Sequence, residues 1–415
     1  MLITNSKIKI TVIGVGYVGL VTAICFAHFG YEVTCLDVDK SKIDRLNHGE
    51  CVIYEPGLQK MLTKHRDNLI FTSDDFKAFD NCDAIFICVG TPEKEDGTCD
   101  LSYVYKVADS IAKYVSNNCL VVIKSTVPVG TNELVKEYIE SSLAYNVKLL
   151  FASNPEFLAQ GSAVKDTLEA TRIVIGAESE NAIEALKIIY RPFNLPYVVT
   201  NIRSAELMKY ACNAFLATKI SFINEMANLC ELLGADINDI RRGMGLDPRI
   251  GNKFLNPGIG YGGSCFSKDT KALLSFAKEA GYDLRIVEST IEVNEEQRLI
   301  LVKKLKKDYP SLKGLRVAIL GVTYKPNTND LRDAPSLDII KELLSEGVEI
   351  YAYDPVAITE LKEVFEDKIH YCHRIKKALE HCEIVMILTE WKQIVDVDRS
   401  LLKDKVIYDG RNCMR

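Results

Sequence analysis

A glycine-rich turn early in the chain constrains the possible folds more than any other feature of the sequence. An apolar, β-branched run at residues 7–13 is followed by Gly14-Val15-Gly16-Tyr17-Val18-Gly19 and then by an apolar, helix-compatible segment at 20–29. This order, with a second strand expected at 31–37, predicts a βαβ unit. In such a unit Gly14 permits the tight turn, Gly16 lets a pyrophosphate approach the backbone, and Gly19 permits close packing of the helix.

The kind of dinucleotide follows from the residue that ends the second strand. Asp37 stands 18 residues after Gly19. A carboxylate there would accept hydrogen bonds from both ribose hydroxyls and repel a 2′-phosphate, so NAD is favoured over NADP. The alternative is a glycine turn in an α/β domain that binds no ligand.

Strand and helix patterns continue to alternate beyond this unit. Strands are expected at 69–72, 84–89, 119–124, 148–152 and 172–176, and helices at 101–115 and 131–143. From Ser204 about thirty residues run with helical periodicity and without Gly or Pro until Gly234, which predicts a long helix. Its apolar residues lie on most sides, which indicates burial between domains or in a subunit interface. Glycine-interrupted helical sequence continues to about residue 308.

A new strand and helix rhythm begins at 315–321 and continues at 348–354, 383–389 and 405–409. We therefore expect an α/β protein with two Rossmann-like, doubly wound domains joined by a long central helix and a helical region. The expected domains are an NAD-binding domain at 1–200, a central helical domain at 201–308 and a second Rossmann-like domain at 309–415. Gly321 opens no G-x-G-x-x-G pattern, so the last domain is assigned a substrate cleft and no dinucleotide.

Composition excludes several classes of protein. The net charge of −6 argues against a nucleic-acid partner, and no apolar run approaches the roughly 18 residues of a membrane helix. Residues 1–9 are too polar for a signal peptide, so we expect a soluble, cytoplasmic protein without a membrane partner. The 13 cysteines are odd in number and scattered, which is typical of reduced core thiols, and no Cys or His spacing matches a zinc site. We expect no metal.

A second glycine-rich segment at 258–269 (GIGYGGSCFSKD) predicts a loop that surrounds a ligand. Cys265 is the one cysteine in such a setting. Backbone amides, Lys268 and the start of a helix would favour its thiolate, which makes Cys265 a candidate nucleophile. A thiol without a catalytic role is the alternative.

Several other motifs stand where a ligand would bind. Lys209 and Asn213 are four residues apart on the long predicted helix, so an ammonium and an amide could converge on one oxygen, although such a pair is usually a solvated edge. The segments 89–92 (VGTP), 124–130 (KSTVPVG) and 154–158 (NPEFL) each follow a strand, at the carboxyl edge where ligands bind. Turn chemistry explains their glycines and prolines better than it explains Glu156.

Together these segments closely resemble the UDP-glucose/GDP-mannose dehydrogenase family over nearly the whole chain. The resemblance rests on the GVGYVG turn, STVPVGT at 125–131, NPEFL, the helix with Lys209 and Asn213, GIGYGGSCFSKD, and YKPNTNDLR at 324–332. It implies two successive hydride transfers to NAD at one site, which convert the C6 alcohol of a nucleotide sugar to an aldehyde and then to a carboxylate. Cys265 would hold the aldehyde as a thiohemiacetal and then as a thioester that water cleaves.

The resemblance also implies residue roles. Lys209 and Asn213 would stabilise the oxyanion, Asp269 with Thr126 and a water would assist proton removal from the C6 hydroxyl, and Glu156 would serve thioester hydrolysis. The matching NAD positions are Gly14, Gly16, Tyr17, Val18, Gly19, Asp37, Lys42, Thr91, Thr126, Lys268 and Arg332. The matching substrate positions are Glu156, Phe157, Leu158, Lys209, Asn213, Arg249, Phe254, Gly258, Tyr261, Lys325 and Arg411, with Arg249 directed to a neighbouring subunit's site.

Two positions depart from the family pattern. Gln160 stands where the family often has Glu, and Ser267 stands where it usually has Pro, which would have fixed a backbone angle behind Cys265. We expect activity to survive and the loop to be looser.

UDP-glucose is the favoured substrate, with UDP-glucuronate as product and a homodimer as the expected assembly. The same chemistry on GDP-mannose or a UDP-N-acetylhexosamine is the nearest alternative, because sugar choice depends on few contacts. A hydroxyacid or phosphogluconate-type dehydrogenase needs no thiol. A non-enzymatic NAD sensor or scaffold leaves Cys265, Lys209 and Asp269 unexplained.

Overall fold

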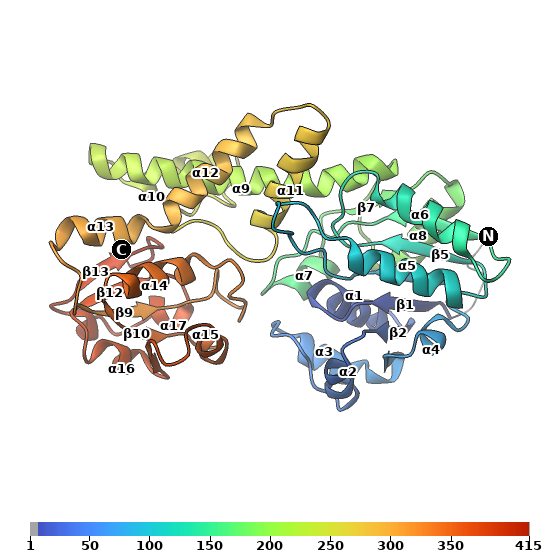
Figure 1. The fold of residues 1–415 in the computed structure, drawn as a ribbon, viewed down its shortest axis with the longest axis horizontal. Coiled ribbons are helices and arrows are strands. Elements are labelled where there is room, and N and C mark those ends of the chain that lie inside the picture. The colour runs from blue at the N-terminus through green and yellow to red at the C-terminus, as the bar shows by residue number, and fades with distance from the viewer. Residues whose placement is uncertain (1–6, 415) are drawn as a thin grey trace. The chain divides into compact units, whose positions relative to one another are not determined.

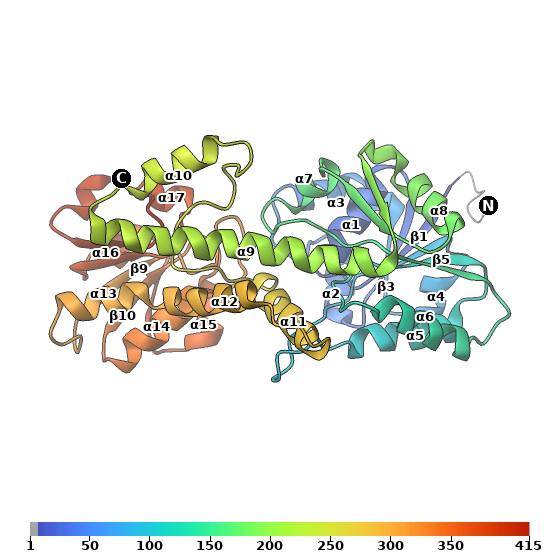
Figure 2. The ribbon, with the colours of Figure 1, turned by 90° about the horizontal axis from the view of Figure 1, so that it is seen from above.

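The computed structural model describes residues 7–414, which divide into two compact units between Ala211 and Cys212. Each unit contains one sheet with helices on both faces (Figure 1, Figure 2). This arrangement, with a long central helix, confirms the predicted fold class. The segment Met1–Ser6, which belongs to the stretch judged too polar for a signal peptide, lies outside the described residues.

The first unit holds an eight-stranded sheet in the order β3-β2-β1-β4-β5-β6-β7-β8. The strands are β1 (Lys9–Ile13), β2 (Glu32–Leu36), β3 (Leu69–Thr72), β4 (Ala84–Ile87), β5 (Cys119–Ile123), β6 (Leu149–Ser153), β7 (Ile173–Gly176) and β8 (Tyr197–Thr200). Their neighbours pair in parallel except β6 and β7, which meet in an antiparallel bridge between Ser153 and Gly176. The sheet is therefore mixed at this one junction, because β7 and β8 form a parallel pair that runs opposite to the other six strands.

Two hydrophobic cores fill the two faces of this sheet. Adjacent strand residues point to opposite faces, as Val12 and Ile13 do, and so enter different cores. One core contains α1 (Tyr17–His28), α2 (Lys40–Asn47), α3 (Leu58–Lys64), α7 (Ala163–Leu168) and α8 (Glu180–Tyr190). The other contains α4 (Asp75–Phe79), α5 (Ser102–Tyr114) and α6 (Thr131–Ser142). Burial on both faces explains why the strands read as continuous apolar runs.

The second unit begins inside the long helix α9 (Ile202–Leu233). It continues through α10 (Ile237–Leu246), α11 (Phe266–Glu279), α12 (Arg285–Arg298) and α13 (Ile300–Asp308). A five-stranded parallel sheet follows in the order β11-β10-β9-β12-β13. Its elements are β9 (Arg316–Leu320), α14 (Pro335–Ser345), β10 (Glu349–Tyr353), α15 (Ile358–Phe365), β11 (His370–Cys372), α16 (Ile375–Leu379), β12 (Ile384–Ile387), α17 (Lys392–Val395) and β13 (Val406–Asp409).

The predicted elements of both units agree closely with the observed ones. β8 and β11 are not among the predicted strands; both lie at the edge of a sheet, and β11 has only three residues. Large apolar side chains remain exposed along α9 at intervals of seven residues, at Phe215, Phe222 and Leu229. Within residues 7–414 no helix combines the length and the apolar character that a bilayer crossing requires.

Candidate active site

The turn between β1 and α1 is shaped by two glycines that have no room for a side chain. Gly14 has a φ of +93°, and a Cβ there would lie 2.9 Å from the carbonyl oxygen of Cys88. A Cβ on Gly19 would lie 1.8 Å from the carbonyl oxygen of Gly14. A Cβ on Gly16, in contrast, would meet nothing within 4 Å. The missing side chain at Gly16 therefore leaves space beside the N-terminus of α1, where an anionic ligand is favoured.

Asp37 follows β2 and its carboxylate holds this turn. Its Oδ2 accepts a hydrogen bond from the Val15 amide at 2.8 Å, and its Oδ1 accepts one from the Asp39 amide at 2.9 Å. The carboxylate is half-buried, so it faces both the turn and solvent. Space at Gly16 and an acceptor at Asp37 fit the pyrophosphate and ribose of NAD.

Other predicted NAD positions lie near the same edge of the sheet. The Thr91 hydroxyl donates to the carbonyl oxygen of Thr126 at 2.8 Å, which ties the end of β4 to the end of β5. Tyr17 reaches the carbonyl oxygen of Tyr54 at 2.7 Å. Lys42, in contrast, forms an exposed ion pair with Asp39 at 3.7 Å.

Glu156 and Lys209 form a buried ion pair in the first unit. The Glu156 Oε1 atom lies 2.9 Å from Lys209 Nζ, and their side chains are only 8% and 4% exposed. Glu156 Oε2 also accepts from the Leu158 amide at 2.7 Å. The ring of Phe157 lies 5.4 Å from Lys209 Nζ and 4.3 Å from the Arg172 guanidinium. The structure thus joins the NPEFL motif to the long helix through charge.

A second buried lysine stands beside this pair and was not assigned a role from the sequence. Lys124 Nζ lies 3.0 Å from Asn154 Oδ1 and 3.4 Å from the Tyr190 hydroxyl, which itself donates to Asn154 Oδ1 at 2.6 Å. Burial lowers the pKa of Lys124, and the neighbouring charge of Lys209 lowers it further, against opposing effects of Cys88 and Glu156. The apolar run that precedes Lys124 was the only signal that its side chain would be buried.

Two buried glutamates cap helix ends near these motifs. Glu206 of α9 accepts from the amides of Gly130 at 2.7 Å and Asn132 at 2.9 Å, and so caps α6. Glu55 accepts from the amides of Gly161 at 2.7 Å and Ala163 at 2.8 Å, and so caps α7. Desolvation by burial raises the pKa of Glu206, against the lowering effect of these hydrogen bonds. Neither glutamate could be identified from sequence, because both act across more than 70 residues.

Cys265 lies at the start of α11 in the second unit and is its N-cap residue. All 13 cysteines fall within the described residues, and Cys265 is the only one that is exposed. Its backbone carbonyl accepts from the Asp269 amide at 2.8 Å, as the first bond of the helix. An accessible sulfur at a helix N-terminus has the surroundings that favour a thiolate. In the first unit, by contrast, burial raises the pKa of the Cys25 and Cys88 thiols to about 12.

Asp269 is the polar centre of this second set of residues. It is 1% exposed, and its Oδ2 accepts from Asn213 Nδ2 at 2.6 Å. Its Oδ1 lies 2.5 Å from Lys268 Nζ. The carboxylate is thus held on both sides, one turn after Cys265, by an amide from α9 and an ammonium from α11.

Three amide side chains fix the loop that leads to Cys265. Asn224 Oδ1 accepts from the Gly258 amide at 2.7 Å, and Gln297 Nε2 donates to the Gly258 carbonyl at 2.7 Å. Asn294 accepts from the Tyr261 amide at 2.7 Å and donates to its carbonyl at 3.2 Å. These residues were missed from the sequence, since isolated amides on helices carry no pattern that names their partner.

Arg411 joins three parts of the second unit. Its Nε donates to the Leu388 carbonyl at 2.7 Å and its Nη2 to the Tyr324 carbonyl at 3.0 Å. A Cβ on Gly258 would lie 2.9 Å from Arg411 Nη1, so this glycine permits the close approach. Lys325 lies next in the chain, with its Nζ 5.6 Å from the Tyr324 ring.

The remaining predicted positions are less closely grouped. Arg332 makes a two-atom ion pair with Asp330, which raises the pKa of Arg332. Phe254 has a φ of +62°, and its ring lies 6.2 Å from that of Phe266. Arg249 is 87% exposed in its side chain and pairs with Asp247 at 2.6 Å. Its contact with a neighbouring subunit stays a prediction.

Comparison with known proteins agrees with these motifs. The NAD binding domain of the UDP-glucose/GDP-mannose dehydrogenase family matches residues 8–194, its central domain matches 203–296 and its UDP binding domain matches 318–415. A UDP-glucose 6-dehydrogenase of Bacillus subtilis is 46% identical over 97% of this chain and 89% of its own length. The chain belongs to the UDP-glucose/GDP-mannose dehydrogenase family.

Solved structures extend the family likeness to three dimensions. A UDP-glucose dehydrogenase from the archaeon Pyrobaculum islandicum has a TM-score of 0.95 at 38% identity, with 99% of this chain and 96% of that one covered. A UDP-D-ManNAc dehydrogenase from Pyrococcus horikoshii has a TM-score of 0.86 at 28% identity, with 98% and 96% covered. As a member of this family the protein is an NAD-dependent dehydrogenase, and its first unit carries the family's NAD-binding domain.

Proposed function

We propose that this protein oxidises UDP-glucose to UDP-glucuronate with Cys265 as the covalent catalyst. The observation that carries the proposal is the exposed Cys265 sulfur at the N-terminus of α11, one turn from the buried Asp269 carboxylate. The likeness to UDP-glucose 6-dehydrogenases at 46% identity favours UDP-glucose over GDP-mannose and the UDP-N-acetylhexosamines. We assign NAD binding to residues 1–200, the catalytic loop and dimer contact to 201–308, and UDP-sugar binding to 309–415.

The first oxidation removes a proton and a hydride from the C6 alcohol. The turn at Gly14–Gly19 and Asp37 would hold NAD, which would supply the hydride acceptor for both oxidations. Asp269, held by Asn213 and Lys268, assists removal of the hydroxyl proton together with Thr126 and a water. The product is an aldehyde, whose carbon is open to attack by a thiolate.

Capture of the aldehyde requires a nucleophile, which Cys265 provides. Its sulfur bonds to C6 to form a thiohemiacetal, and Lys209 and Asn213 stabilise the oxygen that becomes anionic. Loss of a second hydride converts this adduct into a thioester. Water then attacks the thioester carbon, the carbon–sulfur bond breaks, and the carboxylate leaves while the thiol is regenerated. Glu156 supports this hydrolysis by accepting a proton from the water.

The proposed assembly is a homodimer formed through α9. Phe215, Phe222 and Leu229 are 66%, 44% and 44% exposed and recur at intervals of seven residues, so they lie along one side of the helix. An apolar stripe of this kind is stabilised by burial against a second copy. Among the described residues, which include all 13 cysteines, there is no disulfide, as expected for a protein that works in a reducing compartment such as the cytoplasm.

The test is the number of NADH molecules formed for each UDP-glucose consumed by the purified protein. We expect two for the parent protein and no steady carboxylate production for Cys265→Ser. Cys51→Ser, at a half-buried thiol outside the candidate site, is the matched control and should behave as the parent. A ratio of one, or unchanged turnover of Cys265→Ser, contradicts the thioester route. Activity only with GDP-mannose or a UDP-N-acetylhexosamine contradicts the assigned sugar.

A further inference from the structure

The segment after β9 packs closely against the loop that carries Cys265. The Gly263 amide donates to the Arg332 carbonyl at 3.0 Å. A Cβ on Gly262 would lie only 2.2 Å from the carbonyl oxygen of Asp333. The two glycines thus let one backbone lie directly on the other, and any shift of the segment is passed to the loop.

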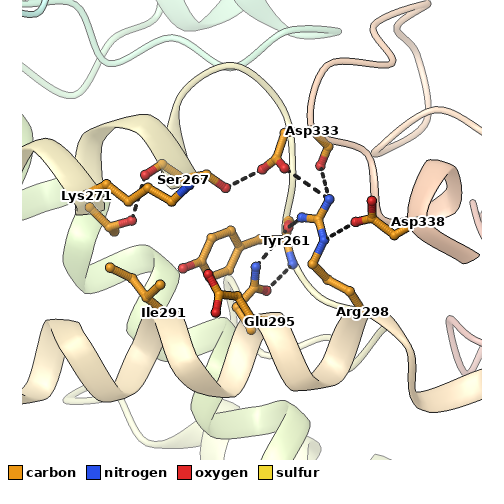
Figure 3. Close-up of a pocket in the computed structure, with 10 residues that line it drawn as sticks. Tyr261, Ser267, Lys271, Ile291, Glu295, Arg298, Asp333 and Asp338 are labelled. Atoms are coloured by element: carbon orange, nitrogen blue, oxygen red, sulfur yellow. Dashed lines mark hydrogen bonds and ion pairs between the residues drawn. The ribbon is translucent and has the colours of Figure 1, made fainter. Parts of the chain in front are cut away.

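Asp333 connects this segment to α11 and α12 through its side chain. Its Oδ2 accepts a hydrogen bond from the Ser267 hydroxyl, and its Oδ1 lies 3.0 Å from Arg298 Nη2 (Figure 3). Arg298 is also held by Asp338 at 2.5 Å and by the Tyr261 carbonyl at 3.3 Å. Its side chain is 12% exposed. Arg298 is therefore a well-fixed anchor for the Asp333 carboxylate.

These residues line a cavity of about 160 Å³ behind the Cys265 loop. Asp333 has a φ of +51°, in the left-handed region that Asp and Asn adopt more readily than other residues with a side chain. A hydrogen bond to Oδ2 and an ion pair to Oδ1 hold its carboxylate there. Arg298 is itself held by Asp338 and the Tyr261 carbonyl, so the position of the Asp333 carboxylate is fixed by tertiary contacts.

Ser267 is the second residue of α11 and follows Cys265 by two positions. The family usually has Pro here, and Pro would fix φ in the first turn of the helix. Ser does not restrict φ, which predicts a looser loop. The structure shows how this chain compensates, since the Ser267 hydroxyl is bonded to a carboxylate that Arg298 holds in place. The restraint comes from tertiary contacts in place of the ring of Pro.

We propose that Ser267, Asp333 and Arg298 form a tether that orients the start of α11 and thereby the Cys265 sulfur. All three are positioning residues, because they act through Cys265. The proposal rests on the proposed function and concerns the step in which Cys265 captures the aldehyde. The first oxidation does not use the sulfur, whereas capture of the aldehyde requires the sulfur to approach C6 along a defined direction.

The test compares variants at two residues of the tether, Ser267 and Asp333. Ser267→Ala removes the hydroxyl, and Asp333→Gly removes both bonds while it tolerates the positive φ. We expect kcat to fall about fivefold for Ser267→Ala and about tenfold or more for Asp333→Gly, with little change in either KM. In the presence of an aldehyde-trapping amine, NADH formed per UDP-glucose should drop below two, because aldehyde escapes before capture.

Ser267→Pro is the decisive variant. This variant lacks the hydroxyl, but the ring of Pro fixes φ at residue 267. We therefore expect the number of NADH molecules formed per UDP-glucose to equal that of the parent protein. Ser345→Ala, which removes an exposed hydroxyl bonded to the Glu342 carbonyl of α14, is the control and should match the parent. Thermal melting of each variant checks that it is folded.

Two outcomes overturn the tether. One is a Ser267→Ala protein with the parent's kcat and NADH ratio, and the other is a Ser267→Pro protein as impaired as Ser267→Ala. A parent protein that forms no NADH from UDP-glucose refutes the proposed function instead, so the two failures are distinguishable.

Discussion

The turn after β1 and the turn after β9 start with the same geometry and then differ. The first reads Gly14-Val15-Gly16-Tyr17-Val18-Gly19 and the second reads Gly321-Val322-Thr323-Tyr324-Lys325-Pro326. Both opening glycines have positive φ, +93° and +81°. Gly14 donates to Leu36 at the end of β2, and Gly321 donates to Tyr353 at the end of β10, each at 2.8 Å. In both units the opening glycine therefore bonds to the end of the neighbouring strand, and its presence does not by itself indicate a ligand site.

The difference begins at the third residue of each turn. Gly16 leaves open space, whereas Thr323 fills the same position with a buried side chain that accepts from Trp391 Nε1 at 3.1 Å. The first helix then starts at once, at Tyr17, but α14 starts only at Pro335. The second turn therefore lacks both the space and the adjacent helix N-terminus that a pyrophosphate needs.

The carboxylates after β2 and β10 show the same contrast. Asp37 Oδ2 accepts from Val15, and Asp354 Oδ2 accepts from Val322, both at 2.8 Å. Asp37 is half-buried, but Asp354 is 3% exposed and also accepts from Trp391 Nε1 at 3.2 Å. Both carboxylates accept from backbone amides, but Asp354 is enclosed within the fold, whereas Asp37 keeps partial exposure to solvent. Accessibility at equivalent positions, and not topology, therefore distinguishes the two turns.

The largest expected effect comes from adding a side chain at Gly19, where α1 packs against the first turn. A Cβ on Gly19 would overlap the Gly14 carbonyl, so Gly19→Ala should lower the free energy of unfolding of the first unit by about 1–3 kcal/mol or more and abolish NAD binding. Urea denaturation and calorimetric titration with NAD measure the two effects. A stable Gly19→Ala protein that binds NAD normally would show that the helix does not pack as described.

Gly16→Thr makes the first turn resemble the second. Because a side chain at Gly16 meets no protein atom, the fold should keep its stability while the affinity for NAD falls roughly tenfold to a hundredfold, as charge-assisted bonds to the pyrophosphate are lost. Gly16→Ala should show a smaller loss in the same direction. The comparison fails if Gly16→Thr unfolds the protein or leaves the NAD dissociation constant unchanged.

Asp37→Asn and Asp354→Asn should separate binding from stability. We expect Asp37→Asn to weaken NAD about tenfold with little change in stability, because it loses a charged acceptor for the ribose. Asp354→Asn should destabilise the second unit by about 1–3 kcal/mol, since its amide cannot accept from every donor around it, while NAD affinity is retained. Reversed effects would contradict the assignment of the two carboxylates.

The smallest effect is a pH dependence at Asp354. Desolvation by burial raises the pKa of Asp354, against the lowering effect of backbone hydrogen bonds. The folded state therefore binds this proton more tightly than the unfolded state, and the resulting stability is complete below the unfolded pKa and lost as the pH rises through the folded one. Asp354→Asn stays neutral, so its destabilisation relative to the parent should shrink between about pH 4 and about pH 7. Denaturation at both pH values measures this, and a deficit that grows with pH would contradict it.

Local patterns predicted much of this protein. The glycine turn, the carboxylate after β2 and the helix start after Cys265 depend on residues close together in the chain, so their spacing carries the signal. Gly321 opens no such pattern, and the buried Thr323 fills the third position of its turn. Local patterns could not predict the antiparallel pairing of β6 with β7. The direction of a strand depends on how the chain returns to the sheet and not on the periodicity of its residues.

Tertiary structure alone decided which side chains support these motifs. Lys124 meets Tyr190 across 66 residues, Asn213 meets Asp269 across 56, and Ser267 meets Asp333 across 66. Ser267 is the clearest case, because its sequence predicts a loose loop while the folded chain supplies a bonded carboxylate. Local spacing determines the elements and the reactive groups that they carry, whereas hydrogen bonds and charges between distant elements form only when the packed cores bring those elements together.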